Sequence, residues 1–258
     1  MRKIILLCVL AGLFSAANVW AGNTLRFGIE AEYPPFESKN AQGELVGFDI
    51  ELGKAVCQAA QMQCSWFEAS FDALIPALRA KQFDVINSAM NITQERKERI
   101  DFTQPVYRIP TRLIAREGSG LTPDILSLRG KKIGVLQGSI QEVYAKKHWA
   151  TQGIRVMTYQ DQSMVYSDMV LGRIDATLVM AAAGQSGFLS RPEGDGFAFA
   201  GEPVEDPAIL GSGIGFGVRQ GDSALKAVLN QAIAQVKTDG TIQRLGKKYF
   251  PGFDISVE

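Results

Sequence analysis

The stretch that decides the fold is FDVINSAMNITQER, residues 83–96. Its apolar start, Phe83 to Ile86, predicts a short buried strand. A loop of small polar residues follows, and Thr93 is a favourable N-cap for a helix whose first turn delivers Arg96. Exposed backbone N–H groups beside a planar guanidinium suit a carboxylate, which an arginine can bind through two parallel hydrogen bonds. The alternative is a surface helix whose arginine pairs with a nearby acid.

Residues 1–21 have the pattern of a secretory signal peptide. Two basic residues open the segment, an apolar run follows, and a small residue ends it, so we expect cleavage after Ala21. The apolar run is too short to span a bilayer. Cys8 would suggest a lipoprotein, but Leu7 stands before it where a small residue would be needed. Cleavage leaves a net charge of −2, so the chain has no basic excess that would hold a nucleic acid.

The mature chain then contains two cysteines, Cys57 and Cys64. In an exported protein, a pair with such close spacing predicts a disulfide bond. Closing so short a loop contributes about 2–3 kcal/mol. We expect the bond to fasten the end of a helix to the following strand and to have no redox role.

Strands and helices alternate along the chain, which predicts an α/β fold with mostly parallel sheets and helices on both faces. The pattern runs from Thr24 to the strand before Ser88 and restarts at Thr111. A capping box, Ser139 with Glu142, marks the start of a later helix. A weak similarity between residues 77–85 and 169–176 suggests two similar lobes.

The segment 202–207 is a plausible crossing between these lobes because two prolines and three acids interrupt the pattern. Residues 211–218 follow, with glycine at every second position. Such a strand leaves one face bare, so another backbone can approach it closely. Its spacing does not match a dinucleotide-binding fingerprint. We expect the C-terminal helices to return to the first lobe.

The residues needed for several kinds of chemistry are missing. His148 is the only histidine, and it lies beside two lysines, where we expect it to face solvent. With no free cysteine in the mature chain, no His/Cys metal cluster can form. Neither a nucleophile elbow nor a Walker loop is present. We therefore predict no metal, no cofactor and no enzymatic activity.

Seven motifs together resemble the polar amino-acid-binding periplasmic proteins of ABC importers, solute-binding family 3. The similarity is greatest to the branch that binds lysine, arginine, ornithine and histidine, and to its opine-binding relatives. It covers essentially the whole mature chain, including both cysteines. The matching segments are Tyr33–Phe36, Gly47–Ile50, Phe71–Pro76, Ile92–Arg96, Gly134–Ser139, Asp239–Thr241 and Lys248–Phe250.

The resemblance implies the two-lobed periplasmic-binding-protein fold of type II, with the ligand held between lobes that close over it. We expect lobe 1 to comprise residues 22–108 and 212–258, and lobe 2 to comprise 109–211. The crossings would lie near 108–111 and 203–212. The resemblance also implies a periplasmic protein, a small-molecule ligand, transient contact with the membrane subunits of an ABC permease, and a monomer.

Carried over residue by residue, the resemblance assigns Arg96 to the ligand carboxylate. The backbone at Asn91, Ile140 and Gln141 would supply N–H partners, and a helix beginning after Ser139 favours an anion on physical grounds. Tyr33 and Phe71 would sandwich the ligand side chain, and Glu30 would pair with its cation. The alternatives are ordinary core packing for the two rings and a solvent-facing acid at Glu30. The remaining lining residues implied by the resemblance are Ser88, Ala89, Leu136 and Met180.

Two positions depart from the family pattern. Met180 replaces the aspartate that meets the α-ammonium of a free amino acid, and Ala89 replaces a hydroxyl residue. Losing the partner of a buried charge costs about 3–5 kcal/mol. Either another acid compensates, for which Asp161 is the candidate, or the ligand's α-nitrogen is absent, inverted or substituted. Opines and guanidino acids fit the second case, unless Met180 lies out of contact with the ligand.

Three functions compete on this sequence. The first is a solute-binding protein that delivers a basic amino acid or a guanidino or opine-like derivative to a permease. The second is an enzyme on the same scaffold, similar to the periplasmic cyclohexadienyl dehydratases, which would need a proton-transferring group deep in the cleft. Glu30 is the candidate for that group. The third is a ligand-loaded signal for a chemoreceptor without transport.

Overall fold

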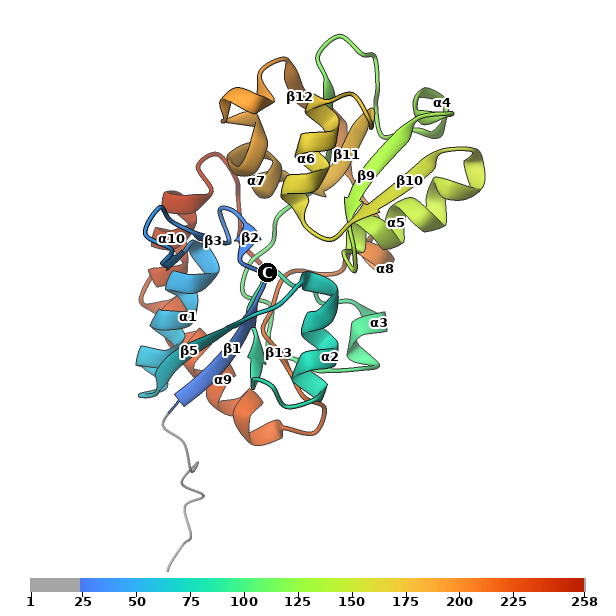
Figure 1. Cartoon of the computed structure of the whole chain (residues 1–258). Helices are drawn as coiled ribbons and strands as arrows, with labels where there is room; N and C mark the ends of the chain where they lie inside the picture. The colour runs from blue at the N-terminus through green and yellow to red at the C-terminus, as the bar shows by residue number, and fades with distance from the viewer. Residues whose placement is uncertain (1–23, 258) are drawn as a thin grey trace, which may run out of the picture.

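The computed structural model describes residues 24–257, in two lobes that each contain a five-stranded sheet (Figure 1). The predicted signal peptide and its cleavage site lie outside these residues. The α/β fold class is confirmed. The first sheet has the strand order β5 (Gln63–Glu68), β1 (Thr24–Ile29), β6 (Val85–Ile86), β13 (Gly217–Val218), β7 (Asp101–Phe102). The second has the order β10 (Arg155–Tyr159), β9 (Lys132–Leu136), β11 (Ala176–Met180), β8 (Thr111–Arg116), β12 (Phe197–Val204).

Both sheets are mixed, and their parallel pairs lie where helices connect successive strands. In the first sheet β1 pairs in parallel with β5 and β6, whereas β13 runs antiparallel to β6 and β7. In the second, β9 pairs in parallel with β10 and β11, whereas β8 runs antiparallel to β11 and β12. The chain passes between the sheets at two places. The first lies between β7 and β8, and the second lies between β12 and β13. Parallel strands end at the same edge, so both sheets direct their loops towards the other lobe.

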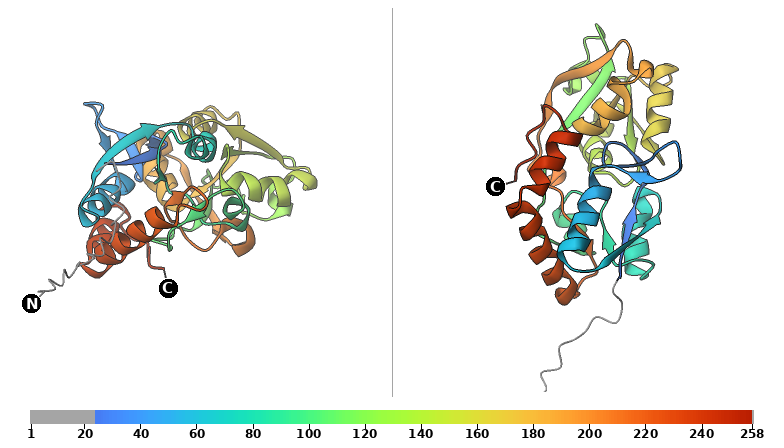
Figure 2. Two further views of the ribbon diagram at one scale, coloured as in Figure 1. Left: turned by 90° about the horizontal axis from the view of Figure 1, so that it is seen from below. Right: turned by 90° about the vertical axis from the view of Figure 1, so that its left-hand side faces the viewer.

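Helices cover the faces of both sheets and complete each lobe. Those of the first lobe are α1 (Phe48–Ala59), α2 (Leu74–Arg79), α3 (Gln94–Lys97), α9 (Ser223–Thr238) and α10 (Thr241–Tyr249), with a 3₁₀ turn at Phe71–Ala73. Those of the second are α4 (Ile125–Leu128), α5 (Ile140–His148), α6 (Gln162–Val170), α7 (Ala181–Gly184) and α8 (Pro207–Leu210). The second lobe also has a π-helix at Gln185–Leu189 and 3₁₀ turns at Ala150–Gln152 and Pro192–Gly194. Figure 2 shows α9 and α10 along the flank of the first lobe.

A small antiparallel sheet projects from the first lobe between β1 and α1. Its strands are β2 (Glu32–Tyr33), β3 (Glu37–Lys39) and β4 (Leu45–Val46). The Tyr33 ring stacks on Phe36 with 5.5 Å between centroids, and Phe36 in turn contacts Tyr107 and Phe250. This aromatic packing fixes the loop that follows β1 at the edge facing the second lobe.

The glycine-rich segment approaches other backbone closely, as its pattern predicts. A Cβ atom on Gly211 would lie 2.3 Å from the carbonyl oxygen of Ile92, and its φ of +80° also favours glycine. Further along, Ile214 forms isolated bridges with both Asn91 and Tyr107. The stretch 88–96 is therefore fastened directly to the returning chain.

Two further expectations have clear outcomes. Cys57 and Cys64 form the predicted disulfide, which joins the end of α1 to the start of β5. His148 is partly exposed, with 38 % of its side chain accessible, and its Nε2 also lies 2.8 Å from Asp206 Oδ2, a contact that ties α5 to the segment before α8. Among the described residues, no helix is long and apolar enough to cross a membrane.

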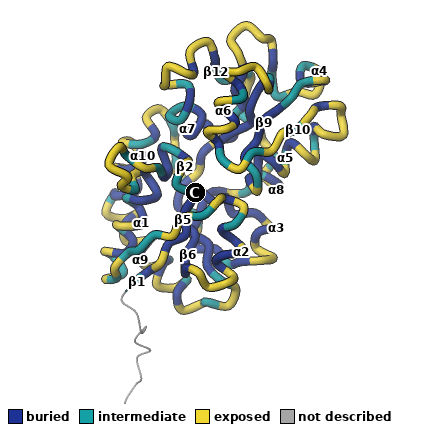
Figure 3. Tube along the Cα trace, in the orientation of Figure 1, coloured by how far each residue is buried: buried dark blue, intermediate teal, exposed yellow. Residues whose placement is uncertain are grey.

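The apolar core of the first lobe continues across the interface between the lobes. The same cluster of buried side chains contains Phe27 and Phe83 of the first lobe and Leu136, Met180 and Phe188 of the second. A separate core covers the other face of the second sheet. Figure 3 shows buried chain running through both lobes and where they meet. The lobes are thus packed against each other, and the edges where β1, β6, β9 and β11 end lie between them.

Candidate functional site

Arg96 occupies the interface between the lobes. Thr93 Oγ1 accepts a hydrogen bond from Arg96 N at 3.2 Å, which confirms the predicted N-cap of α3. The guanidinium donates from Nη1 to Asn91 O at 2.8 Å and from Nη2 to Gly138 O of the second lobe at 3.1 Å. It also lies over the Phe71 ring, 5.4 Å from the centroid.

The side chain of Arg96 is a buried cation and not a member of a surface ion pair. The residue is 9 % exposed, and no ion pair involves it within residues 24–257. Burial lowers its pKa to about 10, so the guanidinium stays charged at neutral pH. A buried cation without an acid partner favours an anion from outside the chain.

The start of α5 faces Arg96 from the other lobe. Ser139 Oγ accepts from Glu142 N at 3.1 Å, as the capping box predicts. The return bond differs, because the Glu142 carboxylate accepts from Gly138 N at 2.6 Å and not from Ser139 N. Within the described chain, no backbone hydrogen bond is recorded from Ile140 N or Gln141 N. These two N–H groups are available to an anion, and the helix dipole favours one there.

Glu30 is a buried acid without a partner. The residue is 4 % exposed, and within residues 24–257 neither carboxylate oxygen has a hydrogen-bond partner. Burial, together with the nearby charges of Asp161, Glu32 and Asp72, raises the pKa of Glu30 to about 8. Its carboxylate is not the solvent-facing group of the alternative interpretation. An unpaired buried acid among other acids has the electrostatics of a cation site.

Aromatic side chains from β2 and from the 3₁₀ turn Phe71–Ala73 lie beside these charges. Tyr33 is 7 % exposed and Phe71 is 9 % exposed. Burial raises the pKa of Tyr33 well above its usual value, so its hydroxyl stays protonated. Each ring also belongs to the continuous apolar core.

The second lobe contributes buried residues at the ends of β9 and β11. Leu136 ends β9 and Met180 ends β11, and each is 4 % exposed. The Gln141 side chain donates to Thr111 Oγ1 at 2.9 Å, so it is bound within its own lobe and only its backbone faces the cleft. Asp161 caps α6 by accepting from Met164 N at 2.9 Å.

Ser88 and Ala89 lie under the cleft, where the Ser88 hydroxyl and the Ala89 N–H both form hydrogen bonds within the first lobe. Ser88 Oγ accepts from Glu30 N at 3.0 Å and donates to Glu37 Oε1 at 2.6 Å. Ala89 adopts a φ of +44°, and its N–H donates to Asp49 Oδ2 at 2.6 Å. The Ser88 hydroxyl therefore points into the lobe, towards Glu37.

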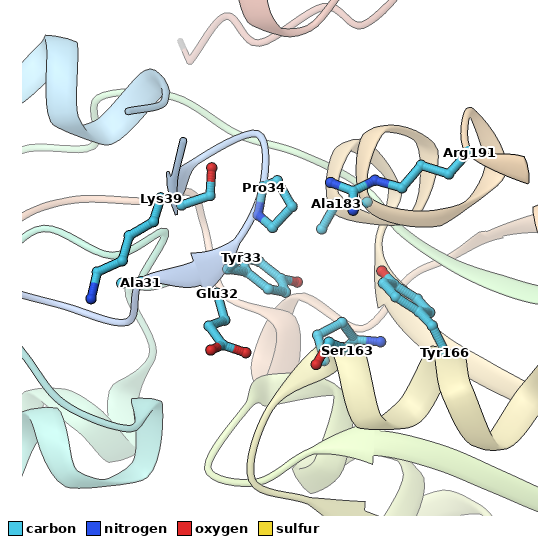
Figure 4. Close-up of a pocket in the computed structure, with 12 residues that line it drawn as sticks. Ala31, Glu32, Tyr33, Pro34, Lys39, Ser163, Tyr166, Ala183 and Arg191 are labelled. Carbon is cyan, nitrogen blue, oxygen red and sulfur yellow. The ribbon is translucent and has the colours of Figure 1, made fainter. Parts of the chain in front are cut away.

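Two cavities open between the lobes on either side of these residues. One, of about 290 Å³, places Tyr33 and Pro34 opposite Tyr166 and Ala183 (Figure 4). The other, of about 400 Å³, is lined by Arg96 and Phe71 from one lobe and by Gly138 and Ile140 from the other. Both cavities are bounded by both lobes, so their shape depends on how far the lobes close.

Sequence reasoning missed three residues behind the site: Glu37, Asp49 and Tyr107. Both acids are fully buried, and Tyr107 donates from its hydroxyl to Asp49 Oδ1 at 2.9 Å. The available signal was weak, namely an acid beside Phe48 in the first turn of an apolar helix. Among the described residues, no group of three His, Cys, Asp or Glu side chains could hold a metal ion.

Sequence comparison places this chain among proteins that bind small solutes, in agreement with the buried charged groups between its lobes. Residues 25–252 match the family model of bacterial extracellular solute-binding proteins, family 3. The chain belongs to this family. A lysine/arginine/ornithine-binding periplasmic protein of Escherichia coli (strain K12) is 45 % identical over 96 % of each chain. A histidine-binding periplasmic protein of Salmonella typhimurium is 43 % identical over 99 % of each chain.

Solved structures of the family share the fold. A periplasmic binding protein of Salmonella typhimurium with high arginine specificity superposes with a TM-score of 0.81 at 32 % identity, covering 88 % of this chain and 99 % of its own. These relatives of the solute-binding family are named as binding proteins and not as enzymes. Their periplasmic location agrees with the disulfide bond of this chain, because such bonds are typical of exported proteins.

Proposed function

We propose that the chain captures a basic amino acid, or a guanidino or opine-like derivative, between its lobes and delivers it to an ABC permease. The observation that carries this proposal is the unpaired, buried Glu30 carboxylate in the same interface as the buried Arg96 cation. A ligand with a carboxylate at one end and a cation at the other neutralises both. Homologues named for lysine, arginine, ornithine and histidine support the same ligand class.

The carboxylate end is proposed to lie between Arg96 and the start of α5. Arg96 supplies charge and hydrogen bonds from the first lobe, and the Ile140 and Gln141 N–H groups supply hydrogen bonds from the second. A ligand gains both sets of contacts only when the lobes close, and that difference in contacts drives closure. The Asn91 backbone adds a donor from the first lobe, and Leu136 lines the apolar floor.

The cationic end is proposed to lie at Glu30 between the rings of Tyr33 and Phe71. An ion pair removes the cost of the buried carboxylate, and each aromatic face adds about 0.5–2 kcal/mol. Guanidinium suits this position because it is planar and stacks on aromatic rings.

The ligand's α-nitrogen is proposed to be absent, inverted or substituted. Met180 and Ala89 offer it neither a carboxylate nor a hydroxyl. Asp161 caps α6 and its charge acts on Glu30, which supports a role at the cationic end of the cleft. A methionine side chain accommodates additional carbon at such a position.

We propose that the lobes comprise residues 22–108 with 212–258, and 109–211, and that the crossings at 108–111 and 203–212 form the hinge. The chain leaves the first sheet after β7 and enters the second at Thr111, and it leaves β12 at Val204 and reaches β13 at Gly217. A single clamshell holds the whole ligand, so we also propose that the protein acts as a monomer.

Titration of the purified protein tests the function directly. L- and D-arginine, lysine, ornithine, histidine, octopine, nopaline, agmatine and 4-guanidinobutyrate are screened by thermal shift and calorimetry. A ligand at a hundred times its Kd should stabilise the protein by about 2.7 kcal/mol. Arg96→Ala should abolish binding of every carboxylate ligand and should matter little for agmatine, which has none. Unchanged affinity for carboxylate ligands in Arg96→Ala would remove the anion assignment.

A further inference from the structure

Two fully buried acids lie side by side behind the cleft. Glu37 belongs to β3 and Asp49 to the first turn of α1, and both are 0 % exposed. Within residues 24–257, no Lys or Arg side chain forms a hydrogen bond or ion pair with either. Two adjacent carboxylates without a cation cannot both be ionised, so one of them holds a proton.

The hydrogen bonds identify which acid holds the proton. Both oxygens of Asp49 accept, Oδ1 from the Tyr107 hydroxyl at 2.9 Å and Oδ2 from Ala89 N at 2.6 Å. Glu37 Oε1 accepts from Ser88 Oγ, but Oε2 finds no donor among the described residues. A proton on Glu37 Oε2 that is donated to Asp49 satisfies this last oxygen.

The electrostatics agree with this assignment. Burial raises the pKa of Asp49 to about 6, and the hydrogen bonds from Ala89 and Tyr107 oppose the rise. Burial and the neighbouring Asp49 raise the pKa of Glu37 well above its usual value, and Glu30 raises it further. The other titratable groups that face the pair are the phenols of Tyr107 and Tyr33, which are neutral at physiological pH.

The pair is connected to both ends of the proposed ligand site. On one side, Ser88 Oγ links Glu37 to the backbone N–H of Glu30. On the other, Asp49 holds Ala89 at a φ of +44°, a conformation that a residue with a side chain rarely adopts. Two residues later, Asn91 O accepts the Arg96 guanidinium. Loop 88–91 therefore contacts both ionisable residues of the site, Glu30 through Ser88 and Arg96 through Asn91.

We propose that protonated Glu37 and ionised Asp49 form a positioning pair that holds loop 88–91 and Glu30 in the ligand-binding geometry. The pair acts through Ser88 and Ala89 and does not touch the ligand. The inference uses the proposed function for the identity of the ligand, whereas the protonation of the pair stands on the burial, the hydrogen bonds and the electrostatics of the two acids.

Conservative substitutions separate positioning from simple packing. In Glu37→Gln the amide oxygen accepts from Ser88 and the amide nitrogen donates to Asp49, which reproduces a protonated glutamate. Its Kd for arginine should stay within about twofold of wild type between pH 6 and 8. In Asp49→Asn an NH₂ group replaces one accepting oxygen, so Ala89 N or the Tyr107 hydroxyl loses its acceptor. Its Kd should rise about tenfold or more, with a binding stoichiometry of one retained.

Further variants keep the inference falsifiable if Asp49→Asn does not fold. Ser88→Ala removes only the link to Glu30, and its Kd should also rise about tenfold. Adding Glu37→Gln to Ser88→Ala should cause no further change. Glu44→Gln removes an exposed acid from the loop between β3 and β4 and serves as the control with unchanged Kd. A weaker Glu37→Gln or an unaffected Asp49→Asn would overturn the assignment.

A ligand-free measurement tests the proton separately. Between pH 5 and 8 the melting temperature of wild type should fall relative to that of Glu37→Gln, because folded Glu37 keeps a proton that the unfolded chain releases. Curves that run in parallel in this range would mean that Glu37 is ionised in the folded protein, and the inference would then fail. A wild type that binds none of the screened ligands would remove the proposed function but leave this result intact.

Discussion

At the scale of single residues, buried Glu30 must lose a proton before it can form an ion pair with a cationic ligand. Its carboxylate is buried with no hydrogen bond from residues 24–257. With a pKa of about 8, the group is mostly neutral at pH 7. A cation that binds beside it must favour the ionised form, so cation binding expels a proton.

The pH dependence of stability follows from the same group. The pKa of Glu30 in the folded protein is about 8, above the ordinary value of 4.5, so the folded state holds a proton that the unfolded state releases. Stability should therefore fall between pH 4.5 and 8 by at most about 1.4 kcal/mol per pH unit from this group. Glu30→Gln should melt with wild type at pH 5 and above it at pH 8.5. Identical melting curves at both pH values would show that Glu30 is not buried in solution.

Met180 decides whether the ligand carries an ordinary α-ammonium. Met180→Asp places a carboxylate at the end of β11, where it would pair with that group. Preference should move from substituted ligands to plain L-amino acids by about two orders of magnitude, because an unpaired buried charge costs about 3–5 kcal/mol. Calorimetry with L-arginine and octopine measures the ratio, and Met157→Asp, at an exposed methionine of the same lobe, is the control. An unchanged ratio would place Met180 outside the pocket.

At the scale of elements, short helices bring the proposed donors to the cleft. The four-residue α3 carries Arg96, and α5 directs its first N–H groups at the same region. Each helix begins at a side-chain cap, Thr93 for α3 and Ser139 for α5. Weakening a cap loosens the first turn and with it the donor geometry.

Such local features could be predicted from the sequence because the residues that cause them are close together. Thr93 and Ser139 form the expected caps, and Cys57 bonds to Cys64 within one short loop. The pairing of Glu37 with Asp49 was not predicted, since it depends on how the small sheet packs on α1. The contact between His148 and Asp206 was not predicted for the same reason, because Asp206 lies in a distant segment.

Ser139→Ala tests the role of the α5 cap. Loss of the bond to Glu142 N should lower the free energy of unfolding by about 1 kcal/mol and weaken arginine binding several-fold. Asp124→Ala is the matched control, because Asp124 caps α4 in the same lobe through Leu126 N and Ser127 N. The control should lose similar stability with no change in Kd. Equal changes in Kd for both variants would contradict a direct role for the α5 terminus.

At the scale of the whole molecule, specific contacts hold the lobes together. Arg96 reaches Gly138 O, and Gln137 Nε2 donates to Asp72 Oδ2 at 2.7 Å. The continuous apolar core adds area that open lobes would expose to water. These contacts alone leave the Glu30 carboxyl and the Arg96 cation without ionic partners. A ligand that pairs them therefore shifts the population towards the closed form.

Gly138→Ala separates closure from folding. Gly138 has a φ of +75°, and a Cβ atom there would lie 2.9 Å from Asp72 Cα of the other lobe. Gly153 has a φ of +80° with nothing within 4 Å, so Gly153→Ala carries similar backbone strain without the inter-lobe contact. Both variants should lose about 1–2 kcal/mol of stability. Only Gly138→Ala should weaken arginine binding, by about tenfold or more, and keep a larger radius of gyration in saturating ligand. Equal affinity in the two variants would mean that the ligand binds without bringing Gly138 against Asp72.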